Sequence, residues 1–136
     1  MPLLTAALLV VSHASAGPRL SVPAAPVPAG SAVTITLAVD GTAVSLDGCS
    51  PVELERKRGE RWEPVESPTL CDGITPARVA TKDLIVSIAV SGPGEYRAVA
   101  TFGTGCVAGR AFAQAACKST GTVRSGAFIV DPAPQR

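Results

Sequence analysis

The sequence contains no asparagine, one histidine, one methionine and few aromatic residues (4% of the chain). Without asparagine there is no acceptor for N-linked glycosylation. His13 and Met1 both precede residue 17, so the rest of the chain lacks the commonest general base and the commonest metal ligand. The scarcity of aromatic side chains leaves no platform on which nucleic-acid bases could stack. These absences disfavour catalysis based on histidine, histidine or methionine metal sites, and nucleic-acid binding.

The charges of the chain nearly cancel, with 12 basic and 11 acidic residues and a formal net charge of +1. Such a balance gives no net attraction to nucleic acid or to an anionic membrane. A chain of 136 residues has room for one domain. We therefore expect a single domain with no nucleic-acid partner, no cofactor and no metal.

Residues 1–16 have the pattern of a signal peptide. An apolar run from Leu3 to Val11 is followed by Ala14-Ser15-Ala16, which resembles an A-x-A cleavage site, although no basic residue precedes the run. Cleavage is expected before Gly17, and the mature chain would then have no segment for membrane insertion. The richness in Ala, Gly, Pro, Val and Arg is typical of a GC-rich bacterial genome. We predict a secreted or periplasmic bacterial protein.

Four cysteines remain after this cleavage: Cys49, Cys71, Cys106 and Cys117. An even number of cysteines in an exported chain predicts disulfide bonds. Three connectivities are possible, including a cross-sheet bridge. We favour Cys49–Cys71 with Cys106–Cys117, because each pair brackets a candidate hairpin. A four-cysteine zinc site is the rival interpretation, but the paired C-x2-C spacing of such sites is missing.

Alternating apolar residues predict β-strands along most of the remaining chain. Residues 33–39 and 84–90 place valine, isoleucine and leucine at every second position, and residues 96–102 begin a further alternation. Residues 52–66 predict a charged hairpin turning at Gly59, and residues 122–131 predict a last strand. Because strand and turn signals recur every 8 to 12 residues or so, we predict an all-β, antiparallel, disulfide-stabilised sandwich of about seven strands.

The predicted organisation has four parts. A signal peptide (1–16) precedes a proline-rich segment with an edge strand (17–31), since proline is confined to edges and turns of sheets. The sandwich domain spans 32–131. A short tail (132–136) follows.

The segment SGPGEYRAVATF, residues 91–102, resembles the corner between two strands of immunoglobulin-like and fibronectin type III-like sandwiches. In those domains a tyrosine just after the turn bonds back across the corner. The resemblance implies an Ig-like fold in which Tyr96 is the corner tyrosine and Trp62 could fill the role of a core tryptophan. Unlike antibody domains, this chain has Ala98 where a cysteine would stand, so a bacterial Ig-like module is the better comparison.

Residues 103–108, GTGCVA, match the G-x-G-x-x-G/A pattern of a dinucleotide-binding loop. Such a site needs a parallel βαβ unit and an acidic residue about twenty positions later, but that window holds Val123 and Arg124. We therefore interpret this segment as the tip of a hairpin held by Cys106 and Cys117. Its candidate binding residues are Arg110, Phe112 and Gln114.

The charged hairpin carries five acidic residues, and two of them facing one cleft could act as the carboxylate pair of a glycosidase. The five are Glu53, Glu55, Glu60, Glu63 and Glu66. They alternate with Arg56, Lys57, Arg58 and Arg61, which favours cross-strand ion pairs on a solvated face. Trp62 within this hairpin is expected to pack in the core, with an interface anchor as the alternative. We predict no catalytic residues.

The sequence thus predicts a non-enzymatic binding or accessory module of the bacterial envelope or secretome. Its partner would be an unidentified protein or glycan of the envelope. The alternative is a secreted protease inhibitor that acts through the loop between Cys106 and Cys117, because rigid loops carried on a β-scaffold often perform binding functions.

Overall fold

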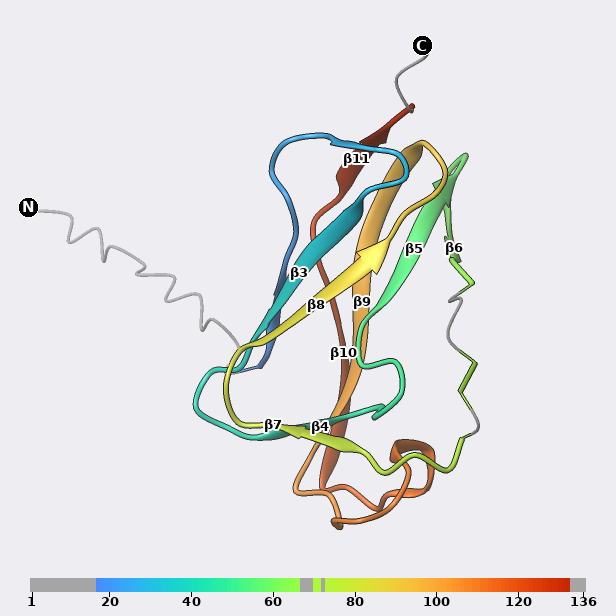
Figure 1. Cartoon of the computed structure of the whole chain (residues 1–136). Coiled ribbons are helices and arrows are strands. Elements are labelled where there is room, and N and C mark those ends of the chain that lie inside the picture. Colours follow the sequence, from blue (N-terminus) through green and yellow to red (C-terminus); the bar gives the residue numbers. More distant parts are fainter. Residues whose placement is uncertain (1–16, 67–69, 72, 133–136) are drawn as a thin grey trace, which may run out of the picture.

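A computed structural model describes residues 17–66, 70, 71 and 73–132 of the chain, and the predicted signal peptide lies outside this range. Figure 1 shows the arrangement of its elements. In chain order they are β1 (Arg19–Ser21), β2 (Val27–Pro28), β3 (Ala32–Ala38), β4 (Val44–Leu46), β5 (Glu53–Arg58), β6 (Arg61–Pro64), β7 (Arg78–Ala80), β8 (Leu84–Ala89), β9 (Gly94–Thr104), the 3-10 helix η1 (Phe112–Gln114), β10 (Ser119–Arg124) and β11 (Phe128–Asp131).

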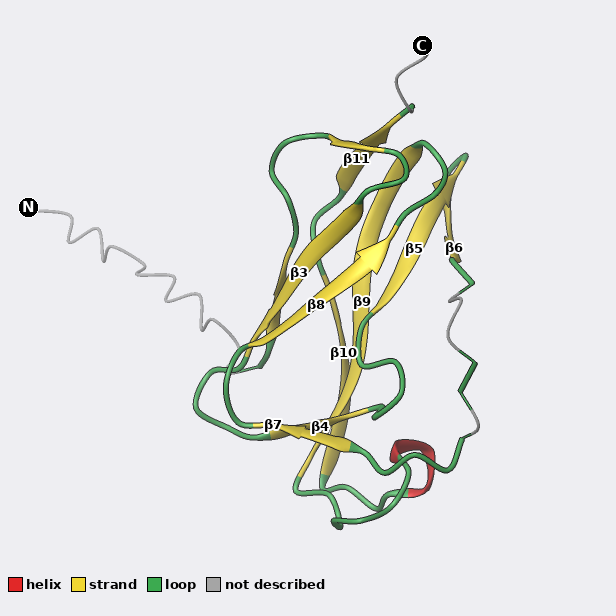
Figure 2. Ribbon diagram, in the orientation of Figure 1, coloured by secondary structure: helices red, strands yellow, loops and turns green. Residues whose placement is uncertain are grey.

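The strands form two sheets, as Figure 2 shows by the strands in yellow. Sheet A has three strands in the order β1-β3-β8. Sheet B has eight, with β9 in contact with β4, β5, β10 and β11, while β2, β6 and β7 add to its margins. Every pairing is antiparallel except that of β2 with β11. The predicted all-β class is therefore confirmed.

The hydrophobic core lies between the two sheets. On β3, Val33, Ile35 and Leu37 are buried while their neighbours Ala32 and Thr34 are exposed. This is the period of two expected for a strand with one face against a core. Facing strands of sheet B supply buried residues with the same period, such as Ala98 and Ala100 on β9. The alternation in the sequence thus predicted the buried face of each long strand correctly.

The predicted last strand is divided into two. β10 and β11 both pair with β9, but the residues between them leave the ladder. There the Ser125 hydroxyl accepts a hydrogen bond from the Ala98 N–H (2.8 Å), and the Ser125 N–H donates to the Ala98 carbonyl (2.9 Å). A side chain thus replaces a backbone partner at the break. The prediction of one continuous strand was wrong for this reason.

The prediction of about seven strands was also too low, because eleven are present in the described part of the chain. The proline-rich segment forms two short strands, β1 and β2, each at the edge of a different sheet. β4 and β7 are three-residue strands that pair with each other. Strands this short leave little alternation to detect in a sequence.

Tyr96 closes the turn between β8 and β9. Its phenol donates a hydrogen bond to the carbonyl of Gly92, four residues earlier (2.7 Å). Its ring stacks on Phe128, with ring centroids 5.8 Å apart, and the Arg56 guanidinium lies over the ring. These contacts fix the path of the chain into β9.

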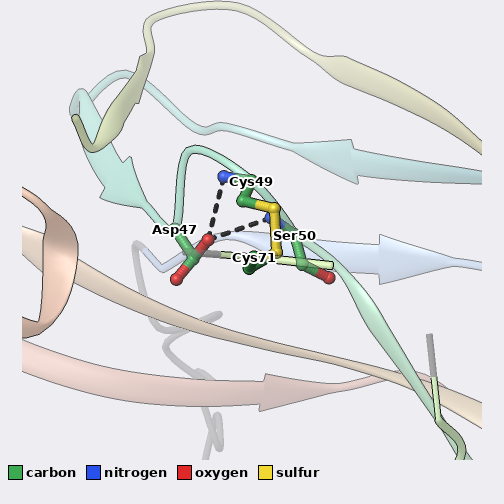
Figure 3. The surroundings of a disulfide bond; sticks show 4 residues. All are labelled: Asp47, Cys49, Ser50 and Cys71. Atoms are coloured by element: carbon green, nitrogen blue, oxygen red, sulfur yellow. Dashed lines mark hydrogen bonds between the residues drawn. A yellow bond between two sulfur atoms is a disulfide. The ribbon is translucent and has the colours of Figure 1, made fainter. Parts of the chain in front are cut away.

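Two disulfides join the four cysteines, Cys49 to Cys71 and Cys106 to Cys117, as predicted. Figure 3 shows the first of them beside Asp47, whose carboxylate accepts hydrogen bonds from the N–H groups of Cys49 and Ser50, both at 2.9 Å. The turn that carries Cys49 is thus held at its start by the Asp47 carboxylate and at Cys49 by the disulfide. Two disulfides in a chain of this size indicate an oxidising environment.

The described residues include no helix that is long and apolar enough to cross a membrane.

Candidate functional site

The loop between Cys106 and Cys117 is closed at its base by several contacts. The disulfide spans the loop, and β9 and β10 pair up to Thr104 and Ser119, whose hydroxyls are hydrogen-bonded. Within the loop, the Val107 N–H donates to the Ala116 carbonyl (2.9 Å). The predicted hairpin with a disulfide-linked tip is confirmed. We call residues 106–117 the stapled loop.

The tip of the stapled loop is braced by a second segment of the chain. The Ala77 N–H donates to the carbonyl of Arg110 (2.8 Å), and Pro76 forms an isolated β-bridge with Ala111. Ala111 is buried as a result. Figure 1 shows this loop and its short helix at the end of the sandwich that also carries β4 and β7. The loop is therefore anchored at its base and at its tip.

The candidate residues on this loop take different positions. The Arg110 side chain is exposed, and Phe112 is half-buried at the start of η1. Gln114 ends η1. The structure therefore brings these three positions together on one braced loop.

Two exposed apolar residues near the loop were not predicted. Val107 is 53% exposed on the stapled loop, and Ile74, 75% exposed, lies just before the bracing residues Pro76 and Ala77. Val107 could have been identified from the sequence, but the approach of Ile74 to this end depends on a non-local pairing that no local pattern encodes.

Trp62 lies elsewhere, on β6 near the opposite end of the sandwich (Figure 1). It is only partly buried and does not belong to the core cluster, so the expectation of core packing was wrong. Its ring lies under the Arg97 guanidinium (4.4 Å to the ring centroid) and near Lys57 (5.9 Å). The alternation of the hairpin places Trp62 on the outer face of sheet B, beside cations instead of aliphatic residues.

The same outer face carries the ion pairs expected from the charged hairpin. The Arg97 guanidinium donates to Glu55 (2.8 Å), Arg124 approaches the same carboxylate at 3.8 Å, and Lys57 pairs with Glu95 at 3.7 Å. Cross-strand ion pairs on a solvated face were predicted and are present. Arg56 and Arg58 point to the other side, where Arg56 donates to the Pro93 carbonyl and Arg58 pairs with Glu63 at 2.9 Å. Since successive residues of a strand face opposite sides, Arg56 could not share the face of Glu55.

Two of the carboxylates that could form a glycosidase pair take part in ion pairs instead. Glu55 and Glu63 are engaged by arginines and do not face each other across a cleft. No group of three or more histidine, cysteine, aspartate or glutamate side chains suited to a metal ion occurs within the described ranges. No protein-family model matches this chain, and no curated protein shows significant sequence similarity to it.

Proposed function

We propose that this chain is an exported, non-enzymatic recognition module of the bacterial envelope or secretome, and that the stapled loop is its binding surface. The observation that carries this proposal is the double anchoring of the loop, by the Cys106–Cys117 disulfide and by the contacts of Pro76 and Ala77 with its tip. A loop held in one conformation loses little entropy on binding.

The side chains on this loop also suit a binding role. Arg110 supplies an exposed cation, while Val107 and the neighbouring Ile74 supply exposed apolar surface. Mixed surfaces of this kind are typical of protein interfaces, where arginine is enriched among the residues that dominate affinity. The partner would be a protein or glycan of the envelope.

The compartment rests on two observations. Both disulfides require an oxidising environment to persist, and residues 1–16 have the pattern of a signal peptide. We propose that the signal peptide is removed before Gly17 and that the mature chain is periplasmic or secreted.

We also propose that the fold is an immunoglobulin-like sandwich. The hydrogen bond from Tyr96 to the Gly92 carbonyl supports this assignment, because it has the form of a tyrosine corner. The two-sheet arrangement, with β9 central in the larger sheet, agrees with it as well. Fold alone does not determine function, so the recognition role depends on the loop.

The protease-inhibitor alternative receives less support from the loop geometry. A residue held for attack in a serine protease must place its carbonyl oxygen among the donors of the oxyanion hole. The carbonyl of Arg110, the exposed basic residue of the loop, instead accepts the Ala77 N–H. Binding without inhibition fits this loop better.

The test is a comparison of matched variants in an affinity capture from envelope extract and culture medium, using the chain from Gly17 with both disulfides formed. The loop variant carries Arg110→Ala and Phe112→Ala, and the control carries Arg61→Ala and Ile129→Ala on exposed strand positions. A partner retained by the wild type and the control but lost by the loop variant would support the proposal.

Because Phe112 is half-buried, Val107→Ser serves as a second loop variant, and the melting temperature of each variant checks its folding. Partners retained equally by all folded variants would contradict the assignment of the loop. Inhibition of a broad-specificity serine protease by the pure protein would favour the inhibitor instead.

A further inference from the structure

A groove lies along the free edge of β8, on the long side of the sandwich. It has a volume of about 390 Å³, and its lining comes from β8, from β5 with the turn before it, from Val65 and Glu66 after β6, and from Arg78 of β7. Its larger aliphatic lining residues are Val52, Leu54, Val65, Val86 and Ile88. None of the groove residues belongs to the stapled loop, so this is a separate surface.

The wall of the groove is a strand without a second neighbour. β8 pairs with β3, and no other strand of the described chain pairs with it. Val90 donates its N–H to the Ser31 carbonyl, in register with the β3–β8 ladder. Since hydrogen bonding alternates along an antiparallel strand, the N–H and C=O groups of Ile85, Ser87 and Ala89 point toward the free edge.

The β8 edge lacks the features that usually prevent an exposed strand from pairing with another chain. Exposed edges generally carry lysine, proline or a bulge. β8 has the sequence LIVSIA, without a charge or proline, and Ile85 is 68% exposed on its outer face. An uncharged edge above an apolar floor has the two features that added strands require: free backbone groups and space for alternate side chains.

We propose that the groove binds an extended segment of another polypeptide, which adds to sheet A as an antiparallel strand beside β8, like the other pairings of this sheet. The segment has apolar side chains at alternate positions, directed toward Val52, Leu54 and Val65. Two of the three charged residues on the groove, Glu53 and Glu66, are acidic and only Arg78 is basic. A basic residue flanking the apolar positions therefore fits best.

The geometry disfavours other occupants. The lining of the groove extends beyond β5 to Val65 and Glu66. If two copies paired edge to edge through β8, these segments of the two copies would clash. Residues 1–16 are removed in the proposed mature form.

The test uses the mature chain and the synthetic peptide acetyl-Lys-Thr-Val-Thr-Ile-Thr-Val-Thr-Lys-amide. The comparison peptide, acetyl-Lys-Thr-Thr-Val-Val-Ile-Thr-Thr-Lys-amide, has the same composition without the alternation. Binding is followed by amide chemical shifts and amide hydrogen exchange. We expect saturable binding of the first peptide, at least about tenfold tighter than the second, with exchange slowed at Ile85, Ser87 and Ala89.

Backbone variants of the peptide test the strand geometry without altering the protein. When the peptide lies antiparallel to β8, its valines and isoleucine share a face with Val86 and Ile88, and its threonine N–H groups point toward β8. N-methylation of the two central threonines should weaken binding at least about tenfold, whereas N-methylation of the two valines should not.

A protein variant provides the reciprocal test. Ser87→Pro removes an edge N–H and should reduce affinity at least about tenfold, while Ser87→Ala keeps it and should bind as the wild type does. If Ser87→Pro does not fold, the comparison of the two N-methylated peptides tests the proposal instead. Equal binding of the alternating and comparison peptides, or equal effects of both methylation patterns, would overturn the proposal. Concentration-dependent dimerisation through β8 would also overturn it, since a second copy would then fill the edge.

Discussion

The Sγ atom of Cys117 lies 2.6 Å from the position that a Cβ atom on Gly103 would occupy, and the Sγ atom of Cys106 lies equally close. The disulfide therefore rests directly on the backbone of β9. The φ angle of Gly103 is not positive, so it is the space under the disulfide that excludes a side chain. Gly103 is the first glycine of the segment that matches the dinucleotide-binding pattern. Its missing side chain leaves the space that the disulfide occupies.

Gly103→Ala should destabilise the protein by about 1–3 kcal/mol, because the added methyl group meets two covalently fixed sulfur atoms. Chemical denaturation under oxidising conditions measures the loss. Gly126→Ala is the matched control, since nothing lies within 4 Å of its added Cβ atom. Equal stabilities of the two variants would contradict the close packing at Gly103.

Removing either disulfide should cost about 3 kcal/mol. The sequence separations are 22 for Cys49–Cys71 and 11 for Cys106–Cys117, and closure of loops this long restricts the unfolded chain by about that amount. The measurement is urea denaturation of the two double serine variants. A loss below about 1 kcal/mol for the Cys106–Cys117 variant would show that other contacts hold the loop base.

Tyr96→Phe should lower stability by about 1–2 kcal/mol, because it removes the hydrogen bond to the Gly92 carbonyl while keeping the stacking on Phe128. Ser125→Ala offers a comparison, since it removes a different part-buried hydrogen bond, the one to the Ala98 N–H. Thermal and urea unfolding measure both. An unchanged Tyr96→Phe variant would mean that the ring, and not the phenol, fixes the turn.

Trp62→Ala should cost only about 1 kcal/mol, because the indole makes cation contacts on the outer face. Leu54→Ala, on the adjacent strand but inside the core, should cost about 2–5 kcal/mol. Urea denaturation of the two variants side by side tests the placement of Trp62. A larger loss at Trp62 than at Leu54 would contradict it.

The sequence predicted strands, turns and buried faces correctly where the relevant pattern lies within the element itself. Strict alternation along β3 and β8 predicted both the strands and their buried faces, and Gly59 located the turn of the charged hairpin. The cysteine pairing followed because each pair brackets a compact segment. In all these cases the information lies within a few residues of the element it determines.

The features that were predicted wrongly or missed depend on contacts between residues far apart in the sequence. Trp62 is a large apolar residue and was expected in the core, but its register opposite Lys57 directs it outward. The pairing of Pro76 with Ala111, which braces the stapled loop, joins two segments with no complementary pattern. The groove beside β8 depends on which strand lacks a neighbour, a property of the whole topology.

The position of β9 has a consequence for how the chain reaches its native state. β9 pairs with strands that precede it, at Ser45 and Glu53, and with strands that follow it, at Ser119 and Phe128. Sheet B therefore cannot form until most of the chain is available. Because contacts between distant residues require the closure of long loops, we expect slow folding, with newly synthesised chains exposing unpaired strand edges until the last strands join β9.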